Sequence, residues 1–341
     1  MQTTYIASTS LLLLIACGSA SATSGAGQHP AGATEPRDGF ACPEGSFDPP
    51  VLTGKPLRVE GVPPPDAFND HNRDFTNIEG AVWFNDALYV SEINPGRALP
   101  NQPPPSRVLR ISESGEVSVA IAADSGTNGL ALSPAGELVG AVHKDGSISV
   151  LRLGSTAPRS LATQFMGARF DSPNDLTFHR NGTLYFTDPD YQAPTPRPQA
   201  ATRAYRVPAG GEAIAIEELV QPNGITLSRN QDFLYIGGGS LRRYPVLADG
   251  SLGQGQAFAG GGPTDGMVID CADNLYAAAD GVSVFDAMGR SIGKIVVSDL
   301  TQVTNVAFGG RDHKTLYITG QGSGTKKGLF KLRINVVGFP F

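Results

Sequence analysis

The sequence predicts an all-β fold, a six-bladed β-propeller with four-stranded blades. Three observations favour it: a motif that recurs six times, turn signals inside the copies, and a composition suited to short strands. The chain has 42 glycines and 26 prolines among 341 residues, and only 17% of its residues are charged. No long segment shows a clear 3.6-residue periodicity, so interposed helices are not expected.

Six segments share one pattern. Each opens with Glu, Asn or Asp, continues into an apolar stretch, turns, and reaches a leucine nine to eleven residues after the opening residue. The opening residues, 40 to 49 positions apart, are Glu79, Asn128, Asn174, Asn223, Asp265 and Asn305. This hairpin fills about half of a repeat, and the remainder holds a second strand pair. One repeat therefore corresponds to one four-stranded blade.

Residues 56–61 precede the first repeat and lack a hairpin of their own. We expect them to form the outermost strand of the last blade, beside residues 328–334. An N-terminal strand placed there would close the ring and remove two free sheet edges. The propeller domain is accordingly predicted over residues 51–341.

The first 16 residues read as a signal peptide, because the apolar run 11–16 is too short to span a bilayer. The segment Leu14-Ile15-Ala16-Cys17 resembles the lipobox of bacterial lipoproteins, which implies cleavage before Cys17 and lipidation of its thiol. A plain secretory signal is the alternative, since no Lys or Arg precedes the run. Both predict export, and the lipobox predicts a membrane-anchored lipoprotein of the bacterial envelope or periplasm. Residues 17–50 are predicted to be a flexible tether and leader.

Two further cysteines, Cys42 and Cys271, remain in the mature chain. Export permits a disulfide between them, and two separate thiols are the alternative. The net charge of −6 provides no basic field. Nucleic acid is therefore not an expected partner.

The opening residues predict a metal site. The first strand of a propeller blade lines the central channel, so the six opening side chains should converge at one mouth. All six offer oxygen, and hard cations such as Ca²⁺ take about six to eight oxygen ligands. This donor set argues against zinc or copper. Alternatively, the Asn-Gly and Asp-Gly pairs mark tight turns.

A second layer of polar residues follows from the topology, because the second strand returns to the same face. These residues are Glu92, His143, Asp188, Asp280 and Gln321. They are candidates for supporting the ligands, carrying protons or contacting substrate, with a solvated strand end as the alternative for each, and His143 could titrate near neutrality. Two proline-rich loops, 94–106 and 189–202, leave the same face. Within the second loop, Tyr191 and Arg197 are either substrate contacts or ordinary surface residues.

Five motifs resemble those of the gluconolactonase family, which includes regucalcin and luciferin-regenerating enzyme, and more distantly diisopropylfluorophosphatase. They are Glu79-GAVW, Phe170-DSPNDLTFHRNGTLYFTDPDY, Gln221-PNGITLS, Thr264-DGMVID and Asn305-VAFGGRDHKTLYIT. The resemblance covers roughly residues 70–335. It implies a six-bladed propeller with a divalent channel metal, often Ca²⁺, for which Zn²⁺, Mg²⁺ or Mn²⁺ could substitute.

The resemblance also implies roles for single residues. The metal ligands would be Glu79, Asn174, Asn223 and Asp265. Asn128 matches an asparagine that contacts substrate, and Asp175, beside Asn174, would support the ligands. Asp188, placed at the same mouth by the topology, is predicted to support them too. Where some members have an arginine for sugar recognition, this chain has Ser125-Gly126-Thr127. An acidic sugar lactone is therefore not implied.

These residues predict a lactonase that opens a sugar lactone or a similar small ester. The metal would act as Lewis acid, Asp265 as general base, and Asn128 and His143 would bind substrate. No Gly-x-Ser-x-Gly elbow is present to support a nucleophilic serine. The alternatives are a phosphotriesterase-like hydrolase with the same metal and a non-enzymatic ligand-binding propeller.

Overall fold

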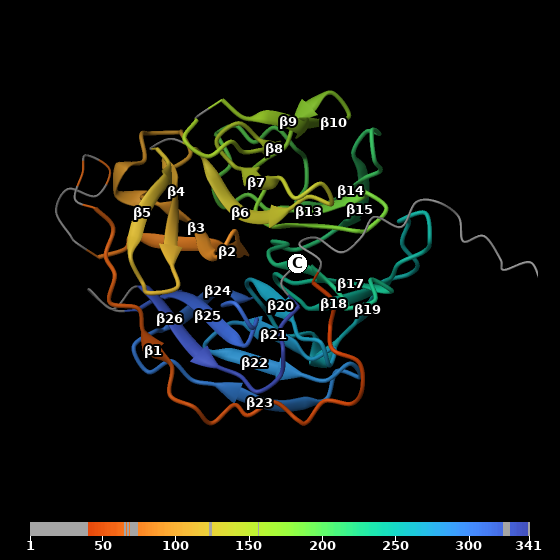
Figure 1. Cartoon of the computed structure of the whole chain (residues 1–341). Coiled ribbons are helices and arrows are strands. Elements are labelled where there is room, and N and C mark those ends of the chain that lie inside the picture. The colour runs from red at the N-terminus through yellow and green to blue at the C-terminus, as the bar shows by residue number, and fades with distance from the viewer. Residues whose placement is uncertain are drawn as a thin grey trace, which may run out of the picture. The chain divides into compact units, whose positions relative to one another are not determined.

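The strands of the computed structural model pair almost entirely with their neighbours in sequence. The structure describes residues 40–64, 66, 68, 74–122, 125–155, 157–322 and 328–339. Six four-stranded antiparallel sheets are formed, as Figure 1 shows. The all-β six-bladed prediction is thereby confirmed.

Each blade begins with its inner strand. Blade 1 comprises β2 (Asn77–Phe84), β3 (Ala87–Ile93), β4 (Ser106–Ser112) and β5 (Val117–Ile121). Blade 2 comprises β6 (Thr127–Leu132), β7 (Leu138–Val142), β8 (Ser147–Val150) and β9 (Arg159–Ala162). Blade 3 comprises β12 (Leu176–Phe178), β13 (Leu184–Asp188), β14 (Arg203–Val207) and β15 (Ile214–Glu218). Blade 4 comprises β16 (Ile225–Leu227), β17 (Phe233–Ile236), β18 (Arg242–Pro245) and β19 (Gln256–Ala257). Blade 5 comprises β20 (Met267–Ile269), β21 (Leu275–Ala278), β22 (Val282–Phe285) and β23 (Ser291–Ile295). Blade 6 comprises β24 (Gln302–Gly309), β25 (Thr315–Gln321), β26 (Gly328–Arg333) and β1 (Leu57–Arg58). A small hairpin, β10 (Gln164–Phe165) and β11 (Ala168–Arg169), follows blade 2, and two short 3₁₀ turns occupy Pro95–Arg97 and Ala259–Gly261.

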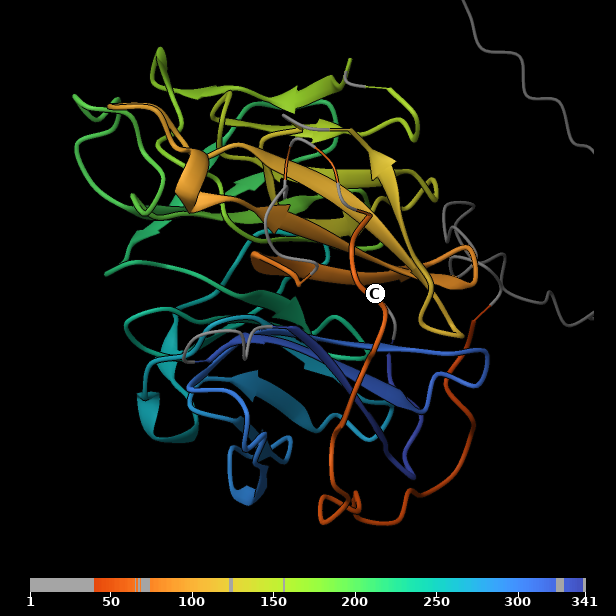
Figure 2. The same cartoon turned by 90° about the vertical axis from the view of Figure 1, so that its left-hand side faces the viewer.

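The inner strands neighbour one another in a closed cycle, β2, β6, β12, β16, β20, β24 and back to β2. Figures 1 and 2 both show the orange strands of the first blade beside the blue strands of the last. The outermost strand of the last blade is β1, where Leu57 pairs with Lys331 and Arg58 with Phe330.

The hydrophobic core is divided among the seams between blades. Six apolar clusters occur, each built from two successive blades. The cluster between blades 2 and 3, for example, packs Val139 and Ile148 against Phe186 and Tyr205. No blade buries its apolar faces alone, so the repeats stabilise each other. This division leaves the centre of the ring to the inner strands.

The predicted hairpin turns use residues suited to positive φ. In blade 1, Asn85 and Asp86 have φ of 47° and 56°, which matches the type I′ turn that joins antiparallel strands. In blade 3, Gly182 has φ of 90°. These tight turns return the second strand of each blade to the face where the repeats open.

The leader is attached to the propeller by a disulfide. Cys42 and Cys271 are bonded, with Cα atoms 5.5 Å apart, which resolves the alternative left open by the sequence. Phe40 also packs edge-on against the His313 ring at 4.6 Å.

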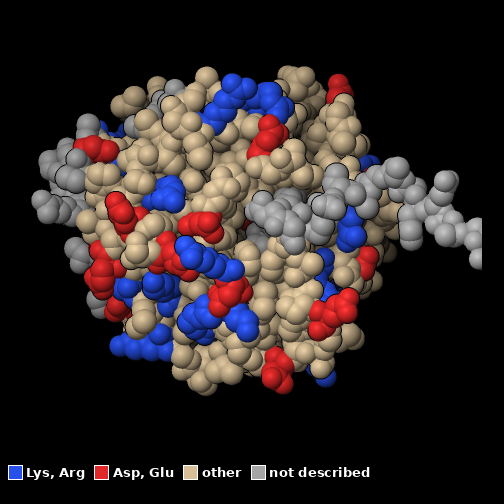
Figure 3. Space-filling model, viewed as in Figure 1, with Lys and Arg blue, Asp and Glu red and all other residues tan. Residues whose placement is uncertain are grey.

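The predicted signal peptide, Cys17 and most of the tether lie outside the described residues. Within the described segments, no helix has the length and apolar character needed to cross a membrane. Figure 3 shows basic and acidic side chains interspersed over the face it draws.

Candidate metal-binding site at the channel mouth

Backbone contacts join the openings of successive blades. The Gly129 N–H donates to the Asn174 carbonyl at 2.6 Å, linking blade 2 to blade 3. The Gly266 N–H donates to the Thr304 carbonyl at 2.9 Å, linking blade 5 to blade 6. The Thr304 hydroxyl in turn donates to the Ile78 carbonyl at 2.8 Å, which returns to blade 1. These contacts link the openings of blades 2 and 3, of blades 5 and 6, and of blades 6 and 1, whereas the convergence of all six opening side chains stays a prediction.

Four openings are followed by a glycine because the next blade is too close for a side chain. A Cβ on Gly80 would lie 2.2 Å from the Asn128 carbonyl oxygen, and one on Gly129 would lie 2.5 Å from the Asn174 carbonyl oxygen. A Cβ on Gly224 would lie 2.2 Å from the Asp265 carbonyl oxygen, and one on Gly266 would lie 2.5 Å from Asn305 Cγ. Of these glycines only Gly80 has a positive φ, 58°. The Asn-Gly and Asp-Gly pairs are therefore points of close blade packing and not tight turns.

Three inner strands carry a β-bulge at the opening. The pairing register shifts between Glu79 and Val82 in β2, between Thr127 and Leu130 in β6, and between Val303 and Asn305 in β24. A bulge re-aims side chains and interrupts the alternation of a strand. Successive polar residues can therefore occupy positions that a regular strand would assign to opposite faces.

Two carboxylates interact at the mouth. Glu79 and Asp265 are both half-buried. Burial, with the nearby charges of Asp265 and Asp175, raises the pKa of Glu79 well above its usual range. Burial raises the pKa of Asp265 to about 7, and the Asp175 charge adds to the effect. Three acidic groups thus crowd one region, and each makes ionisation of its neighbours less favourable.

Amide side chains surround these carboxylates. Gln302 Nε2 donates to Asp265 Oδ2 at 3.1 Å, and Asn223 also hydrogen-bonds the Asp265 carboxylate. Asn77 hydrogen-bonds Glu79. Sequence reasoning missed Gln302 and Asn77, which lie two or three residues before an opening and carry no repeat signal. Gln321, which it did place at the mouth, donates to Asn77 Oδ1.

The donor set fits a hard divalent cation. Glu79 and Asp265 offer carboxylate oxygens, and Asn174 and Asn223 offer amide oxygens, the ligand types that Ca²⁺ prefers. The repulsion between the carboxylates would be relieved by a cation between them. Among the described residues, no group of three or more His, Cys, Asp and Glu has metal-binding geometry. The predicted set has two carboxylates and two amides, so it is not a group of that kind.

Asp175, predicted to support the ligands, spans two blades. Its Oδ1 accepts the N–H of Leu176 at 2.9 Å, and its Oδ2 accepts the N–H of Ile225 in blade 4 at 3.2 Å. Burial nevertheless raises its pKa to about 7. Asp175 therefore connects the segments that carry Asn174 and Asn223.

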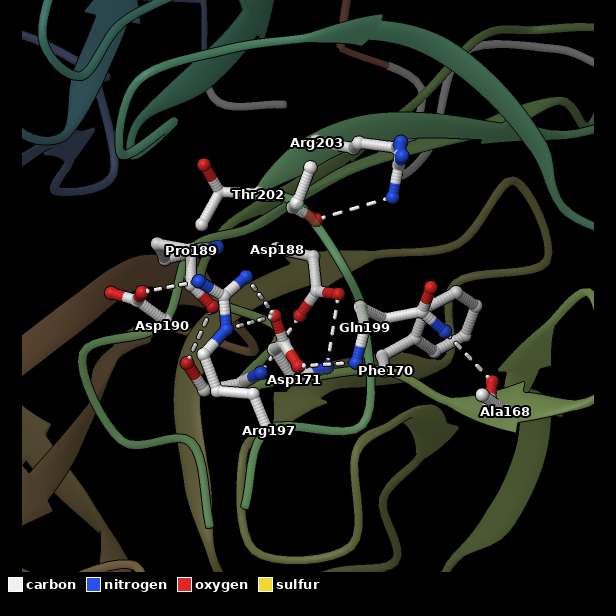
Figure 4. A network of polar contacts seen from close by, with 12 residues as sticks. Ala168, Phe170, Asp171, Asp188, Pro189, Asp190, Arg197, Gln199, Thr202 and Arg203 are labelled. Carbon is white, nitrogen blue, oxygen red and sulfur yellow. Dashed lines mark hydrogen bonds and ion pairs between the residues drawn. The ribbon is translucent and has the colours of Figure 1, made fainter. Parts of the chain in front are cut away.

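Asp188, the other predicted supporting residue, holds the loop before Asn174. Its carboxylate accepts the N–H groups of Asp171 at 3.0 Å and Ser172 at 2.8 Å. Figure 4 shows Asp188 beside Asp171. Burial raises the pKa of Asp188 to about 7. Arg197 lies in the same network, with its guanidinium on Asp171 at 2.7 Å and on Asp190 at 2.8 Å. Arg197 is thus held by two carboxylates, which favours a positioning role over a substrate contact.

Tyr191 lies at the edge of the carboxylate pair. Its hydroxyl donates to the Gln221 carbonyl at 3.5 Å and lies near the Asn223 side chain, and the charges of Asp265 and Glu79 both act on it. Burial, followed by the Asp265 charge, raises the pKa of Tyr191. Its side chain remains 48% exposed.

The two predicted substrate residues are both buried. Asn128 is 3% exposed and lies against Gly80 of the preceding blade. His143 is fully buried, and its Nε2 lies 2.9 Å from the Pro104 carbonyl in the first proline-rich loop.

Two other residues of the predicted second layer are engaged in ion pairs. Glu92 is fully buried and pairs with Arg107 at 2.7 Å. Asp280 is exposed and pairs with Lys294 at 2.6 Å. Both pairings favour structural or surface roles over a part in the carboxylate site.

Known proteins are similar to this chain in sequence and in fold. Residues 78–322 match the family described as the SMP-30/Gluconolactonase/LRE-like region. The gluconolactonase of Zymomonas mobilis is 28% identical over 271 residues, which cover 71% of this chain and 75% of that protein. A solved gluconolactonase from Xanthomonas campestris superposes with a TM-score of 0.66 at 27% identity, over 76% of this chain and 87% of that one.

A fold likeness extends to regucalcin of Agrobacterium tumefaciens, a calcium-binding protein. It has a TM-score of 0.60 at 21% identity and covers 78% of this chain and 92% of that one. The gluconolactonase relatives support the prediction that the protein is a lactonase. With most of its propeller matched by the family's model, the chain belongs to the SMP-30/gluconolactonase/LRE-like family.

Proposed function

We propose that the protein hydrolyses a lactone or a similar small ester at the channel mouth, with a divalent cation. The observation that carries the proposal is the pair of half-buried carboxylates, Glu79 and Asp265, placed together among amide side chains. The similarity to the Zymomonas mobilis gluconolactonase supports the choice of substrate class. Ca²⁺ is the first candidate ion because every proposed donor is an oxygen, and Zn²⁺, Mg²⁺ and Mn²⁺ are the alternatives.

The cation would be held by Glu79, Asn174, Asn223 and Asp265. When bound, it would supply Lewis-acid polarisation of the carbonyl oxygen of the substrate. The protein contributes the arrangement of these donors. Bulges aim the inner-strand openings, glycines allow the blades to approach, and Asp175 connects the blades that carry the two asparagines.

Asp265 is proposed as the general base. One of its carboxylate oxygens would take a proton from a water molecule as the water oxygen attacks the carbonyl carbon. The ring C–O bond then breaks, the ring oxygen takes the proton back from Asp265, and the product is a hydroxy acid. Gln302 and Asn223 orient this carboxylate.

Asn128 and His143 are proposed on the substrate side. Asn128 lies in the opening of the second blade, where its amide could hold a substrate oxygen. His143 would act through the loop that carries Pro104, because its ring contacts that carbonyl. Its burial makes direct proton transfer to substrate less favourable than a part in shaping the mouth.

The direct test is a pH-stat screen of aldonolactones and organophosphates, with and without chelator. The proposal expects lactone hydrolysis that chelator abolishes and added Ca²⁺ restores. Hydrolysis of organophosphates alone would favour the phosphotriesterase-like alternative. Absence of chelator-sensitive hydrolysis of every lactone and ester would favour a ligand-binding propeller.

We also propose that the protein is exported and anchored to the membrane of the bacterial envelope through Cys17. The Leu14-Ile15-Ala16-Cys17 pattern supports the anchor. The bond between Cys42 and Cys271 supports export, because disulfides persist in oxidising compartments. Metabolic labelling with a fatty acid tests the proposal. Wild type should incorporate the label and Cys17→Ser should not, whereas an unlabelled wild type would favour a plain secretory signal.

A further inference from the structure

Tyr191 combines exposure with contact to the proposed site. It belongs to the loop after β13, and its side chain is 48% exposed although its hydroxyl lies near Asn223. The same hydroxyl lies 3.5 Å from the Gln221 carbonyl. A tyrosine placed in this way presents both a ring and a polar tip to whatever enters the mouth.

A polar clamp fixes the residue before Tyr191. The Asp190 carboxylate accepts Gln221 Nε2 at 2.6 Å and Arg197 Nη1 at 2.8 Å. The Asp190 N–H donates to Gln221 Oε1 at 3.3 Å, so the two residues exchange hydrogen bonds. The loop of blade 3 is thereby joined to Gln221, two residues before Asn223 in blade 4.

The clamp is itself anchored on buried groups, as Figure 4 shows. Arg197 reaches from Asp190 to Asp171, which is fully buried. The Ser172 hydroxyl donates to the Pro189 carbonyl at 2.7 Å and fixes the start of the loop. The loop that carries Tyr191 is therefore held at both ends of the segment 189–197. Such rigidity favours a preorganised contact over a freely moving surface residue.

We propose that Tyr191 is a substrate-contacting residue that selects hydroxyl-bearing lactones, and that Arg197 is its positioning residue. This inference rests on the proposed lactonase function. The Tyr191 hydroxyl can donate to or accept from a substrate hydroxyl, and its exposed ring can lie against the C–H face of a sugar ring. A lactone without hydroxyl groups gains nothing from the polar tip. The contact thus discriminates between substrates by a hydrogen bond.

The competing explanation is that Tyr191 only orients Asn223. Removal of the hydroxyl would then weaken cation binding and would affect all substrates equally. Direct contact predicts instead a change confined to hydroxylated substrates, with unchanged cation affinity. The two explanations therefore differ in the substrate dependence of the change and in the cation affinity of the variant.

The experiment compares wild type with Tyr191→Phe on glucono-δ-lactone and δ-valerolactone, and titrates both proteins with Ca²⁺. We expect KM for glucono-δ-lactone to rise about ten-fold, as for loss of one hydrogen bond, with kcat nearly unchanged. KM for δ-valerolactone and the Ca²⁺ affinity should not change. Tyr244→Phe is the matched control, because it removes a hydroxyl that bonds Glu217 on outer strands and should leave both substrates unaffected.

Arg197→Met should shift KM in the same substrate-selective way, with Arg159→Met as control, since Arg159 forms an exposed ion pair with Glu137. Arg197→Lys should recover part of the selectivity. Equal effects of Tyr191→Phe on both lactones, an altered Ca²⁺ affinity, or no effect in an active enzyme would overturn the inference. A wild-type protein that hydrolyses no lactone or ester would instead overturn the proposed function and remove the basis of the inference.

Discussion

Asp188 is the last residue of β13, and Asp265 is the opening residue of blade 5. Burial raises the pKa of each to about 7. Their surroundings differ. Asp188 accepts two backbone N–H groups from the loop before Asn174 and lies near the Arg197 guanidinium. Asp265 is opposed by Glu79, and its described donors are neutral amides. Both regions hold neighbouring acids, since the Asp171 charge also raises the pKa of Asp188. The first region contains the Arg197 guanidinium, which pairs with Asp171 and Asp190, whereas the side-chain donors described for Asp265 are neutral amides.

This difference distinguishes a carboxylate with a structural role from carboxylates that could bind a cation. The Asp188 carboxylate makes its hydrogen bonds within the fold, where they fix the loop before Asn174. Carboxylates that raise each other's pKa cost stability when ionised, and a bound cation would offset that cost. The Asp188 region is therefore interpreted as scaffold and the Glu79–Asp265 region as a cation site.

The largest expected effect is on turnover. Asp265→Asn removes the proposed base and one charged ligand, so lactone hydrolysis should fall by about 10³-fold or more. The fold should be retained, because Asn preserves the shape of the side chain and relieves the repulsion with Glu79. Initial rates and circular dichroism check both parts. Activity close to wild type would remove Asp265 from the mechanism.

The next effect concerns the packing that brings the openings together. A Cβ on Gly224 would lie 2.2 Å from the Asp265 carbonyl. Gly224→Ala should therefore destabilise the protein by about 1–3 kcal/mol through overpacking and should also reduce activity. Gly262→Ala is the control, because its Cβ would meet no atom within 4 Å. Urea unfolding measures the difference, and equal stability of the two variants would contradict the close-packing interpretation.

A comparable or smaller effect is expected on the scaffold side. Asp188→Asn replaces an acceptor oxygen with an N–H₂ group that faces the backbone N–H groups of Asp171 or Ser172. We expect a loss of about 1–2 kcal/mol in the free energy of unfolding. The residual kcat should exceed that of Asp265→Asn. If Asp188→Asn were instead as inactive as Asp265→Asn and as stable as wild type, the contrast between the two regions would fail.

A pH dependence of stability is expected in chelator-treated protein. The folded pKa values of Asp175 and Asp265 are about 7, above the ordinary value of 3.8. The folded state therefore binds protons more tightly than the unfolded state between these values, and stability should decrease as pH rises from about 4 to 7. Added Ca²⁺ should restore stability at pH 8 and have little effect at pH 5, because protonated carboxylates bind the ion weakly. Melting curves at both pH values check this, and a Ca²⁺ effect that is larger at pH 5 would contradict it.

The sequence predicted much of the fold because a propeller repeats its signal. Six openings with the same phase, such as Glu79 and Asp265, identified the inner strands. The repeat also explains the apolar clusters, since each inner strand must pack against its neighbours on both sides. The resemblance in the segment 170–191 predicted the family, which the comparisons confirmed.

The sequence could not predict contacts that depend on distances across blades. Asn77 and Gln302 support the carboxylates from positions without a repeat pattern. The clamp between Asp190 and Gln221 joins two blades through residues 31 positions apart. The role of Gly224 was likewise hidden, because Asn-Gly is also a turn signal. Pairing of Cys42 with Cys271 required the folded path of the leader.

Calorimetric titration of chelator-treated protein with Ca²⁺ at pH 8 tests the central claim most directly, with Glu79→Gln and Asp188→Asn measured beside wild type. The expected result is saturable binding to wild type and to Asp188→Asn, with affinity lowered by about 100-fold in Glu79→Gln. Absence of binding to wild type by Ca²⁺, Zn²⁺, Mg²⁺ and Mn²⁺, or equal affinity of wild type and Glu79→Gln, would contradict a cation site between Glu79 and Asp265.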